Sequence, residues 1–286
     1  MEGVRSRTLK VRGIVHCHTD FSYDCMVSLT DLCAALREEG FSFVALTEHA
    51  EGVTRQSYQR FVDACRRHST GSFVVIPGLE IRCDRGFEIA GVGIPEVVDF
   101  GTADQVVARV RELGGYAIWV HPRKHDNWPG RILDCDALEV LNAKVDGTVA
   151  PSFTLLRRLK KHRGTEARTH AIFGIDLHDL DQPRDVWIEC EAPELTSRKI
   201  VQALREGNFV SRVVNGGVSS SGEIPFAQRL LLVALRFAYL GWNGFRRALP
   251  GRMQTGFTKL SRPIIRVIKA KGDRKREIGC HSLGKR

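Results

Sequence analysis

Histidine and carboxylate residues close several apolar, strand-like runs of this chain, for example RGIVHCH, FVALTEH and AIFGIDLH. In a parallel α/β architecture the C-terminal ends of the strands meet on one face, so residues far apart in sequence converge there. A pocket with this many imidazoles and carboxylates is hard to stabilise without cations, because buried like charges repel and desolvation penalises each charge. We therefore predict a polynuclear metal site and a hydrolase, with these candidate ligands: His16, His18, Asp24, His49, Glu80, His121, Asp176 and His178.

Two histidines one residue apart begin this series. Side chains two positions apart on a strand face the same way, so His16 and His18 can bind one cation together. Cys17 between them then faces the opposite side as a small core residue. A lone H-x-H is also what an exposed strand with alternating polar residues shows. Further ligand-type positions follow in an α/β rhythm, and the joint pattern favours the metal site.

Strand-like and helix-like runs alternate along most of the chain. We predict strands at 11–18, 41–49, 72–81, 87–94, 116–122, 137–142, 171–178 and 185–191. We predict helices at 28–40, 54–68, 102–115, 152–163 and 197–208. Repeated β-then-α units predict a parallel sheet, and their number favours closure into a barrel. A chain of 286 residues is long enough to bury such a core.

The cysteine pattern and the first residues indicate a cytoplasmic protein. The eight cysteines form no C-x-x-C pair and, in a chain of this length, do not indicate a disulfide framework. The opening MEGVRSRTLKVRG is polar and basic, without the apolar stretch of a secretory signal. We therefore expect the reducing cytoplasm as the location.

The net charge of +10 is concentrated toward the C-terminal end. Residues 223–286 hold 15 Lys or Arg and 3 acidic residues, a net charge of +12, whereas the preceding 222 residues hold 28 basic and 30 acidic residues. Residues 215–225 (NGGVSSSGEIP) have the small, polar, Gly-rich composition of a linker. We predict a domain at 1–214, this linker at 215–225, and a basic amphipathic helical tail at 226–286.

The predicted tail begins with an apolar run, FAQRLLLVALRFAYLGW, in which Arg229 and Arg236 lie seven residues apart on one helix face. The run is too short and too charged for a membrane span. We expect an in-plane anchor on the anionic inner face of the membrane, which would make this a peripheral membrane protein. Two alternatives stay open: a helix packed on the barrel or on a dimer partner, and a tail that binds nucleic acid.

The order of the motifs resembles the PHP family (polymerase and histidinol phosphatase), whose opening is a strand ending H-x-H-T followed by S-x-D. This chain reads HCHTDFSYD at 16–24 and continues through ALTEH, GLEI, VHP, EVLN and GIDLH in the family's order. The resemblance covers roughly residues 12–215, and the motifs taken together are very specific. It implies a distorted, TIM-like (β/α)7 barrel that binds two to three divalent ions (Zn, Mn or Fe) at the strand C-termini.

The resemblance implies three groups of metal ligands in this chain. One metal takes His16, His18, Glu80 and Asp176; a second takes His121 and the bridging Glu80; a third takes Asp24, His49 and His178. Glu88 occupies the place of a histidine that the family often has. Its cation is then either held by a harder oxygen ligand, which favours Mn²⁺ or Fe²⁺ over Zn²⁺, or held weakly or absent. Glu48 replaces the family's aspartate and is expected to orient His49.

The reaction that the resemblance implies is phosphoester hydrolysis. A hydroxide bridging two cations is nucleophilic at neutral pH, because metal binding lowers the pKa of water by several units. Asp176 would accept the proton of this nucleophile. Arg123 and Lys124, directly after the VHP motif, are candidates for binding the phosphate, with Arg184 as a further one. A basic pair after a strand is otherwise a solvated loop.

Two functional hypotheses follow. The first is a metal-dependent phosphatase that acts on a small phosphomonoester or a nucleotide, with a nuclease acting on oligonucleotide ends as a close variant. The second is a catalytically weak metal-binding module that its basic tail recruits to a membrane or a partner. Phosphate release by the metal-loaded protein distinguishes the two.

Overall fold

The structure is a computed structural model that describes residues 8–122, 133–163 and 169–248. The chain divides into two compact units. The first comprises Met1–Val213 and Gly217–Ile224, and the second comprises Val214–Gly216 and Pro225–Arg286.

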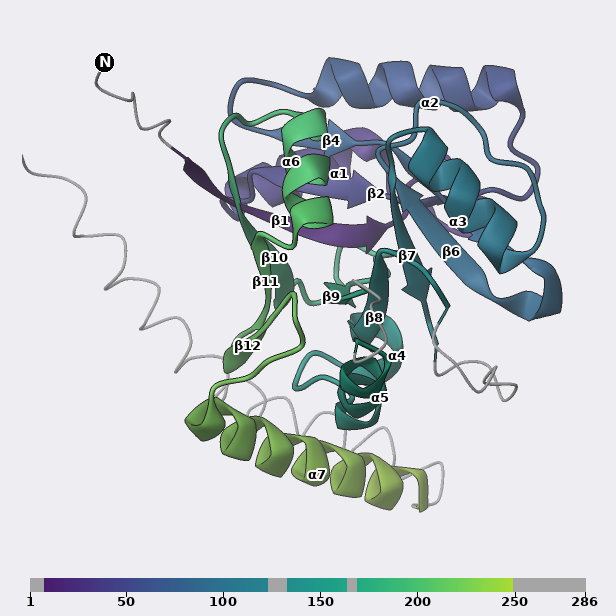
Figure 1. The fold of residues 1–286 in the computed structure, drawn as a ribbon. Helices are drawn as coiled ribbons and strands as arrows, with labels where there is room; N and C mark the ends of the chain where they lie inside the picture. Colours follow the sequence, from purple (N-terminus) through teal and green to yellow (C-terminus); the bar gives the residue numbers. More distant parts are fainter. Residues whose placement is uncertain (1–7, 123–132, 164–168, 249–286) are drawn as a thin grey trace, which may run out of the picture. The chain divides into compact units, whose positions relative to one another are not determined.

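The described residues form two six-stranded sheets (Figure 1). The first sheet contains, in spatial order, β12 (Gly216–Ser219), β11 (Phe209–Val213), β10 (Val186–Ala192), β1 (Leu9–Cys17), β2 (Phe43–Leu46) and β4 (Val74–Ile76). The second contains β3 (Glu48–His49), β5 (Gly78–Arg82), β6 (Glu88–Val92), β7 (Tyr116–Val120), β8 (Ala137–Asn142) and β9 (His170–Gly174). The protein is therefore a mixed α/β structure, as its alternating runs predict.

Both sheets contain antiparallel as well as parallel pairs, so the parallel sheet that the repeated units predict is present only in part. β1 is parallel to β2 but antiparallel to β10. β8 is parallel to both of its neighbours, β7 and β9. β5 and β6 are antiparallel because only a short 3-10 turn, Asp84–Gly86, joins them. A connection this short forms a hairpin, since a parallel pair needs a crossover of a dozen or more residues.

Two of the predicted strands are each divided between the two sheets. The 41–49 run breaks at Thr47 into β2 and β3, and the 72–81 run breaks at Pro77 into β4 and β5. Proline has no N–H to donate to a strand ladder, which accounts for the second break. The segment after β9 continues alongside the end of β1, because Ile175 N donates to Val15 O at 3.0 Å and the N of Leu177 donates to His16 O at 3.3 Å.

The described residues of the first unit contain six helices. They are α1 (Leu29–Glu38), α2 (Arg55–His68), α3 (Ala103–Glu112), α4 (Ala143–Asp146), α5 (Phe153–Arg163) and α6 (Ser197–Glu206). α2 packs on β4, α3 on β6 and β7, α5 on β8, and α6 on β10. Thr54 and Thr102 form capping boxes at the starts of α2 and α3, which satisfies backbone N–H groups that a helix start leaves without partners.

In the hydrophobic core cluster, apolar side chains from strands of both sheets pack together with side chains of α6. The YAIWV run of β7 and the FVAL run of β2 are wholly buried. Trp119, Tyr116, Phe43 and Phe73 are among the largest fully buried side chains. Burying an aromatic side chain of this size stabilises a fold by roughly 1.5–3 kcal/mol, so these strands form a rigid base for the residues at their ends.

The described part of the second unit is one helix, α7 (Phe226–Ala248). It begins one residue after Pro225, where the sequence predicts the tail helix to start. Of the helices in the described ranges, none has both the length and the hydropathy to cross a membrane.

Candidate metal centre

His16 and His18 at the end of β1 both face the carboxylate of Glu80 on β5. His16 Nε2 lies 3.5 Å from Glu80 Oε2, and His18 Nε2 lies 3.3 Å from the same oxygen. All three side chains are buried. The strand register between β1 and β2 shifts between Val15 and Cys17, so His16 occupies a bulge rather than a regular strand position. A bulge redirects one side chain, and here it brings both imidazoles to one carboxylate.

Asp176, just after β9, brings a second carboxylate to the same place. Its Oδ2 lies 3.1 Å from His121 Nε2, and its Oδ1 lies 3.7 Å from His18 Nε2 and 3.2 Å from His178 Nδ1. The carboxylate of Asp176 therefore lies close to three imidazoles, of which His18 follows β1, His121 follows β7 and His178 follows β9. A carboxylate in this position can bridge two cations.

Glu88 lies inside the cluster, although the family often has a histidine there. β6 runs antiparallel to β7 and pairs Glu88 with Val120, which places its carboxylate next to His121. His121 Nδ1 is 2.8 Å from Glu88 Oε2 and 3.3 Å from Glu80 Oε1. The three residues thus offer two oxygens and one nitrogen to a single cation.

Asp24, His49 and His178 form the more open side of the cluster. Asp24 Oδ2 lies 3.3 Å from His49 Nε2 and 3.1 Å from His178 Nε2. The ring of His18 stacks on that of His49, with centroids 4.5 Å apart, and lies tilted to that of His178, with centroids 4.3 Å apart. These are the residues that the sequence predicts for a third metal, and they lie together.

Three residues of the cluster have a left-handed backbone conformation: His16 has a φ of 68°, His121 of 47° and Asp176 of 52°. Outside glycine, positive φ is uncommon, and residues held there cluster at functional sites. His16 lies next to the last residue of β1, His121 directly follows β7, and Asp176 comes two residues after β9. The buried strands therefore hold these three residues in a strained backbone conformation, and their side chains meet in the cluster.

The donor set fits divalent metal ions. Four groups of three side chains have ligand atoms within 4.8 Å of one another: His16, His18 and Glu80; Glu80, Glu88 and His121; His16, His121 and Asp176; His18, His49 and His178. The buried Nε2 atoms of His16 and His18 and both carboxylate oxygens of Glu80 have no hydrogen-bond partner. Buried polar atoms are almost always paired, so these atoms are the ones that a cation would satisfy.

The pKa directions in the cluster show how strongly the carboxylates act on the imidazoles. Burial lowers the pKa of His16, but Glu139, Glu80 and Asp176 outweigh it and raise that pKa well above its ordinary value. Burial raises the pKa of Glu80, but the neighbouring histidines, His16 first, hold it well below its ordinary value. The carboxylate of Glu80 therefore stays ionised and attracts any available positive charge.

The other two buried histidines shift in opposite directions. Burial lowers the pKa of His121, yet its hydrogen bonds to Asp176 and Glu88 raise that pKa to about 9. For His18 burial dominates, and its pKa falls to about 4 despite the contact with Glu80. His18 is therefore neutral at pH 7, the state in which an imidazole binds a metal.

Glu139 and Asn142 on β8 support the ligands from behind. Glu139 Oε1 lies 2.8 Å from His16 Nδ1, and its Oε2 accepts from His121 N at 2.9 Å and from Asn142 Nδ2 at 3.1 Å. Such carboxylates fix the orientation of metal-binding histidines. The EVLN motif contains both residues, so the signal was present in the sequence, but sequence reasoning gave them no role.

Glu48 holds the loop after β1 rather than binding the imidazole of His49. It accepts from Thr19 N at 3.1 Å, from Thr19 Oγ1 at 2.6 Å and from Ser22 Oγ at 2.5 Å. Ser22 Oγ in turn accepts from His49 N at 3.0 Å. Glu48 thus reaches His49 through Ser22 and fixes the loop that carries Asp24.

Two residues at the mouth of the cluster were not singled out from the sequence. Lys144 on α4 has its Nζ 3.1 Å from His178 Nδ1 and 3.5 Å from Asp176 Oδ1. Tyr23 is 74% exposed and stacks on His49, with ring centroids 4.9 Å apart. Lys144 follows the EVLN motif and Tyr23 is the unspecified middle residue of S-x-D, so only their positions in the fold reveal them.

The predicted phosphate-binding residues do not join this group. Arg123 and Lys124 lie outside the described residues. Arg184 Nε donates to Glu39 Oε1 at 2.7 Å, and its Nη1 donates to backbone carbonyls of Leu180 and Gln182. Its guanidinium therefore braces a loop against α1, and its role in binding phosphate stays a prediction.

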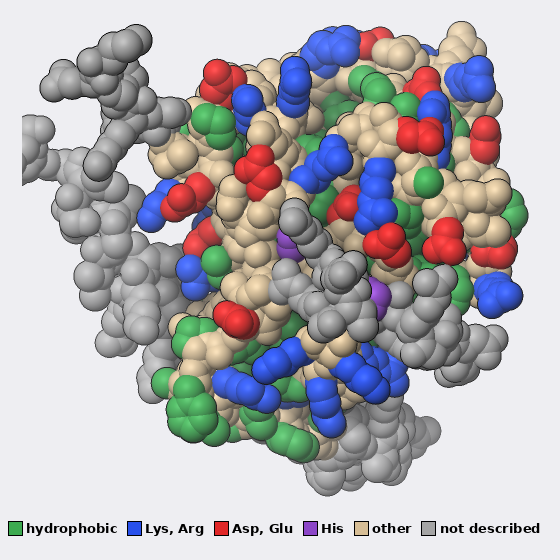
Figure 2. All heavy atoms as spheres, in the orientation of Figure 1, with side chains coloured by type: hydrophobic (Ala, Val, Ile, Leu, Met, Phe, Trp, Pro, Cys, Tyr) green, Lys and Arg blue, Asp and Glu red, His purple; other side chains and the backbone are tan. Residues whose placement is uncertain are grey.

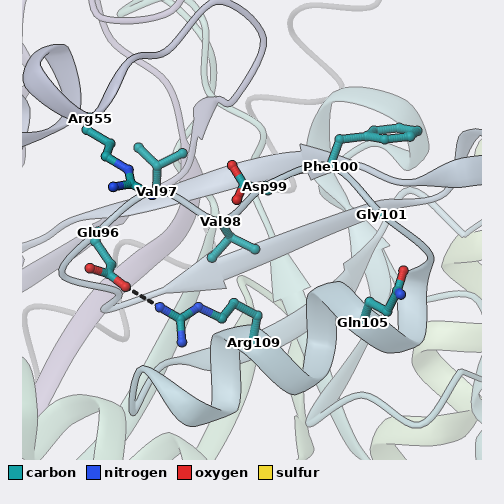
Figure 3. A pocket seen from close by; sticks show the side chains of 9 residues that line it. All are labelled: Arg55, Glu96, Val97, Val98, Asp99, Phe100, Gly101, Gln105 and Arg109. Atoms are coloured by element: carbon teal, nitrogen blue, oxygen red, sulfur yellow. Dashed lines mark hydrogen bonds and ion pairs between the residues drawn. The ribbon is translucent and has the colours of Figure 1, made fainter.

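A hollow of about 300 Å³ lies elsewhere in the first unit, at the segment before α3 (Figure 3). Arg55, Glu96, Asp99 and Arg109 contribute its charges. Arg109 forms ion pairs with Glu96 and with Glu112. No candidate metal ligand is among the described residues that line this hollow, and we assign no function to it.

Comparisons with known proteins agree with the motifs and the geometry. No curated protein sequence matches the chain. A two-domain protein from Bacteroides vulgatus, described as containing a predicted PHP-like metal-dependent phosphoesterase, is 15% identical, with a TM-score of 0.56 over 74% of this chain and 67% of that one. This likeness shows a shared fold.

Two further solved structures are similar over large parts of the chain. PsfC from Pseudomonas syringae is 14% identical, with a TM-score of 0.47 over 80% of this chain and 99% of that one. The lesion-specific endonuclease EndoQ from Pyrococcus furiosus is 11% identical, with a TM-score of 0.49 over 74% of this chain and 59% of that one. The family model of the PHP domain matches residues 15–171, which is more than half of the chain. This match confirms the resemblance, and the chain belongs to the PHP domain family.

Proposed function

We propose that this protein is a metal-dependent hydrolase of phosphoesters, with a small phosphomonoester or a nucleotide as its substrate. The observation that carries the proposal is the buried cluster in which Glu80 and the Nε2 atoms of His16 and His18 lack hydrogen-bond partners. Membership of the PHP domain family and the description of the Bacteroides vulgatus neighbour support it.

The proposal assigns two to three divalent ions to the cluster. When bound, they would supply a water molecule acidified by several pKa units and positive charge for the phosphoryl oxygens. Glu88 adds a second carboxylate around His121, so this position offers harder ligands, which favour Mn²⁺ or Fe²⁺ over Zn²⁺. Asp176, whose two oxygens face different imidazoles, is positioned to hold the proton that the attacking water releases.

The substrate would approach from the open side of the cluster. The side chains of Asp24 and Lys144 are 37% and 46% exposed there, whereas those of His16 and Glu80 are closed off from solvent. A phosphate entering on this side meets Lys144 first. An ammonium group is a compact point charge that suits phosphate.

Lys144 is therefore a further phosphate-binding residue in this proposal. Its Nζ contacts His178 and Asp176, which are candidate metal ligands. A bound cation would repel the ammonium from those ligands, so Lys144 would turn toward an incoming anion. Arg123 and Lys124 would act from the segment after β7, as the sequence predicts.

The architecture of the catalytic domain, residues 1–214, is part of the proposal. Seven strands would form a closed barrel in the order β1, β2 with β3, β4 with β5, β6, β7, β8 and β9. Parallel pairing of β2 with β4 and of β3 with β5 supports it. The hydrogen bonds from Ile175 to Val15 and from Leu177 to His16 would close the ring between β9 and β1. Residues 215–225 would link this domain to the tail at 226–286.

Phosphate release by metal-loaded protein tests the function. We expect chelator-treated protein to be inactive and to regain release of phosphate from 4-nitrophenyl phosphate or AMP when Mn²⁺, Fe²⁺ or Zn²⁺ is added, with metal content measured in parallel. Cleavage of bis(4-nitrophenyl) phosphate in preference to the monoester would favour the nuclease variant. Protein that holds two to three metal ions per chain and releases nothing from either class would favour the metal-binding module instead.

Replacing Lys144 with glutamine is expected to raise the KM for a phosphomonoester about tenfold, since the loss of a charged contact to substrate is worth about 1.5 kcal/mol. Metal content should stay unchanged, because Lys144 is not a ligand. Lys199→Gln, on α6, removes the same charge away from the cluster and is the matched control. An unchanged KM in Lys144→Gln would remove this residue from the substrate site.

A further inference from the structure

The described part of α7 presents large apolar side chains to solvent (Figure 2). Five of them have exposed fractions between 47% and 77%: Phe226, Leu230, Leu231, Phe237 and Leu240. On a helix with 3.6 residues per turn, Phe226, Leu230 and Phe237 fall within an arc of about 40°. A contiguous exposed apolar patch on a protein surface marks a site of interaction with a protein, a membrane or a ligand.

The chain around this stripe is strongly basic. Residues 224–272 hold ten Lys or Arg and no Asp or Glu. Arg229 is exposed on one edge of α7, beside the apolar stripe, whereas Arg236, seven residues further on, is buried. An apolar stripe with cationic flanks is typical of a helix that lies in the plane of a membrane surface.

We propose that α7 binds an anionic lipid bilayer in its interfacial plane, with Phe226, Leu230 and Phe237 inserted among the head groups and upper acyl chains. This assignment is independent of the proposed hydrolysis. Spanning is not part of it, because none of the described helices is apolar and long enough to cross a bilayer.

Charge and apolarity together favour lipid over the other occupants of this surface. A second copy of the chain would bring a second segment of net charge +12 against the first, which is repulsive. A nucleic acid would satisfy the arginines, but it offers no apolar phase for the leucines of the stripe. An anionic bilayer offers both, since apolar burial and attraction of Lys and Arg to the surface add together.

Co-sedimentation of the full chain with vesicles tests the proposal. We expect binding to vesicles of phosphatidylcholine containing about one third phosphatidylglycerol, weaker binding to pure phosphatidylcholine, and loss of binding as NaCl rises from ~0.1 to ~0.5 M. The double variant Leu230→Ser/Phe237→Ser removes the apolar stripe without changing charge. It should lower the vesicle partition coefficient at least tenfold.

A matched control separates the stripe from the rest of the helix. Gln228→Ser also introduces a serine, on the opposite side of α7, but removes no apolar side chain, and it should bind vesicles like the wild type. Circular dichroism and phosphate release monitor the fold of both variants, and neither changes a residue of the candidate metal centre. A wild-type partition coefficient in the double variant overturns the proposal, as does equal binding to neutral and anionic vesicles.

Two other outcomes would also overturn it. Tight, salt-dependent binding of the full chain to a single-stranded oligonucleotide, without binding to anionic vesicles, would assign the surface to nucleic acid. A dimer in solution that the double variant converts to a monomer, again without vesicle binding, would assign the stripe to a second copy of the chain.

Discussion

Replacing Asp176 with asparagine is expected to lower phosphate release by roughly 10³-fold, which corresponds to about 4 kcal/mol of lost transition-state stabilisation. The change removes one charge and almost no volume at a buried carboxylate that contacts His121 Nε2 at 3.1 Å and His178 Nδ1 at 3.2 Å. Metal content should fall with the activity, since an amide is a much weaker ligand than a carboxylate.

The fold should survive this change, because Asp176 has a φ of 52° and asparagine tolerates the left-handed region as well as aspartate does. Asp63→Asn, at an exposed site on α2, makes the same chemical change away from the cluster and should keep full activity. His178→Ala, at the more open side, provides a second variant if Asp176→Asn loses its circular dichroism. Full phosphate release in both variants would remove these residues from the proposed catalytic site.

Replacing Gly174 with alanine is expected to weaken metal binding by 10–100-fold although no ligand is replaced. An alanine Cβ at this position would lie 1.8 Å from Glu139 Oε1 and 3.1 Å from His16 Cβ. Glu139 must then move and lose its 2.8 Å contact with His16 Nδ1. Overpacking of this kind also destabilises a core by roughly 1–3 kcal/mol.

Competition with a chelator of known affinity measures the first effect, and thermal unfolding of the chelator-treated protein measures the second. Gly71→Ala is the matched control, because no atom lies within 4 Å of the added methyl group there. If Gly174→Ala binds metal as tightly as Gly71→Ala does, the carboxylate of Glu139 does not orient His16, and the support of the cluster from β8 must be abandoned.

Most candidate ligands could be named from the sequence because they stand at or just after the end of a strand-like run, whereas Asp24 lies in the loop after the first run and Glu88 lies at the start of β6. Short apolar runs such as YAIWV and AIFGI predict buried strands from local hydrophobicity alone. The residues that follow each run can therefore be placed at strand ends without knowledge of the fold. That Glu80, His121 and Asp176 meet follows from strand ends converging, and the structure does bring them together. The family's histidine position is filled by Glu88, which the motif order also located.

His16 and His18 face the same carboxylate, as the H-x-H spacing predicts, but regular strand pleating does not bring them there. Regular pleating was expected to point both side chains the same way, whereas the structure has a register shift at His16 with a φ of 68°. A bulge leaves almost no signal in the sequence, because its cost is met by packing from residues elsewhere in the chain. The same holds for the positive φ at His121 and Asp176.

Sequence alone determined which residue types stand at the strand ends, the family, and the separation of an acidic-to-neutral domain from a basic, apolar tail segment. These are local properties of composition, periodicity and motif order. Only the tertiary structure decided that the sheets are mixed, that Arg184 braces a loop, and that Lys144 and Tyr23 lie at the mouth of the cluster. Such contacts join segments that are distant in the chain, and their geometry depends on how every element between them packs.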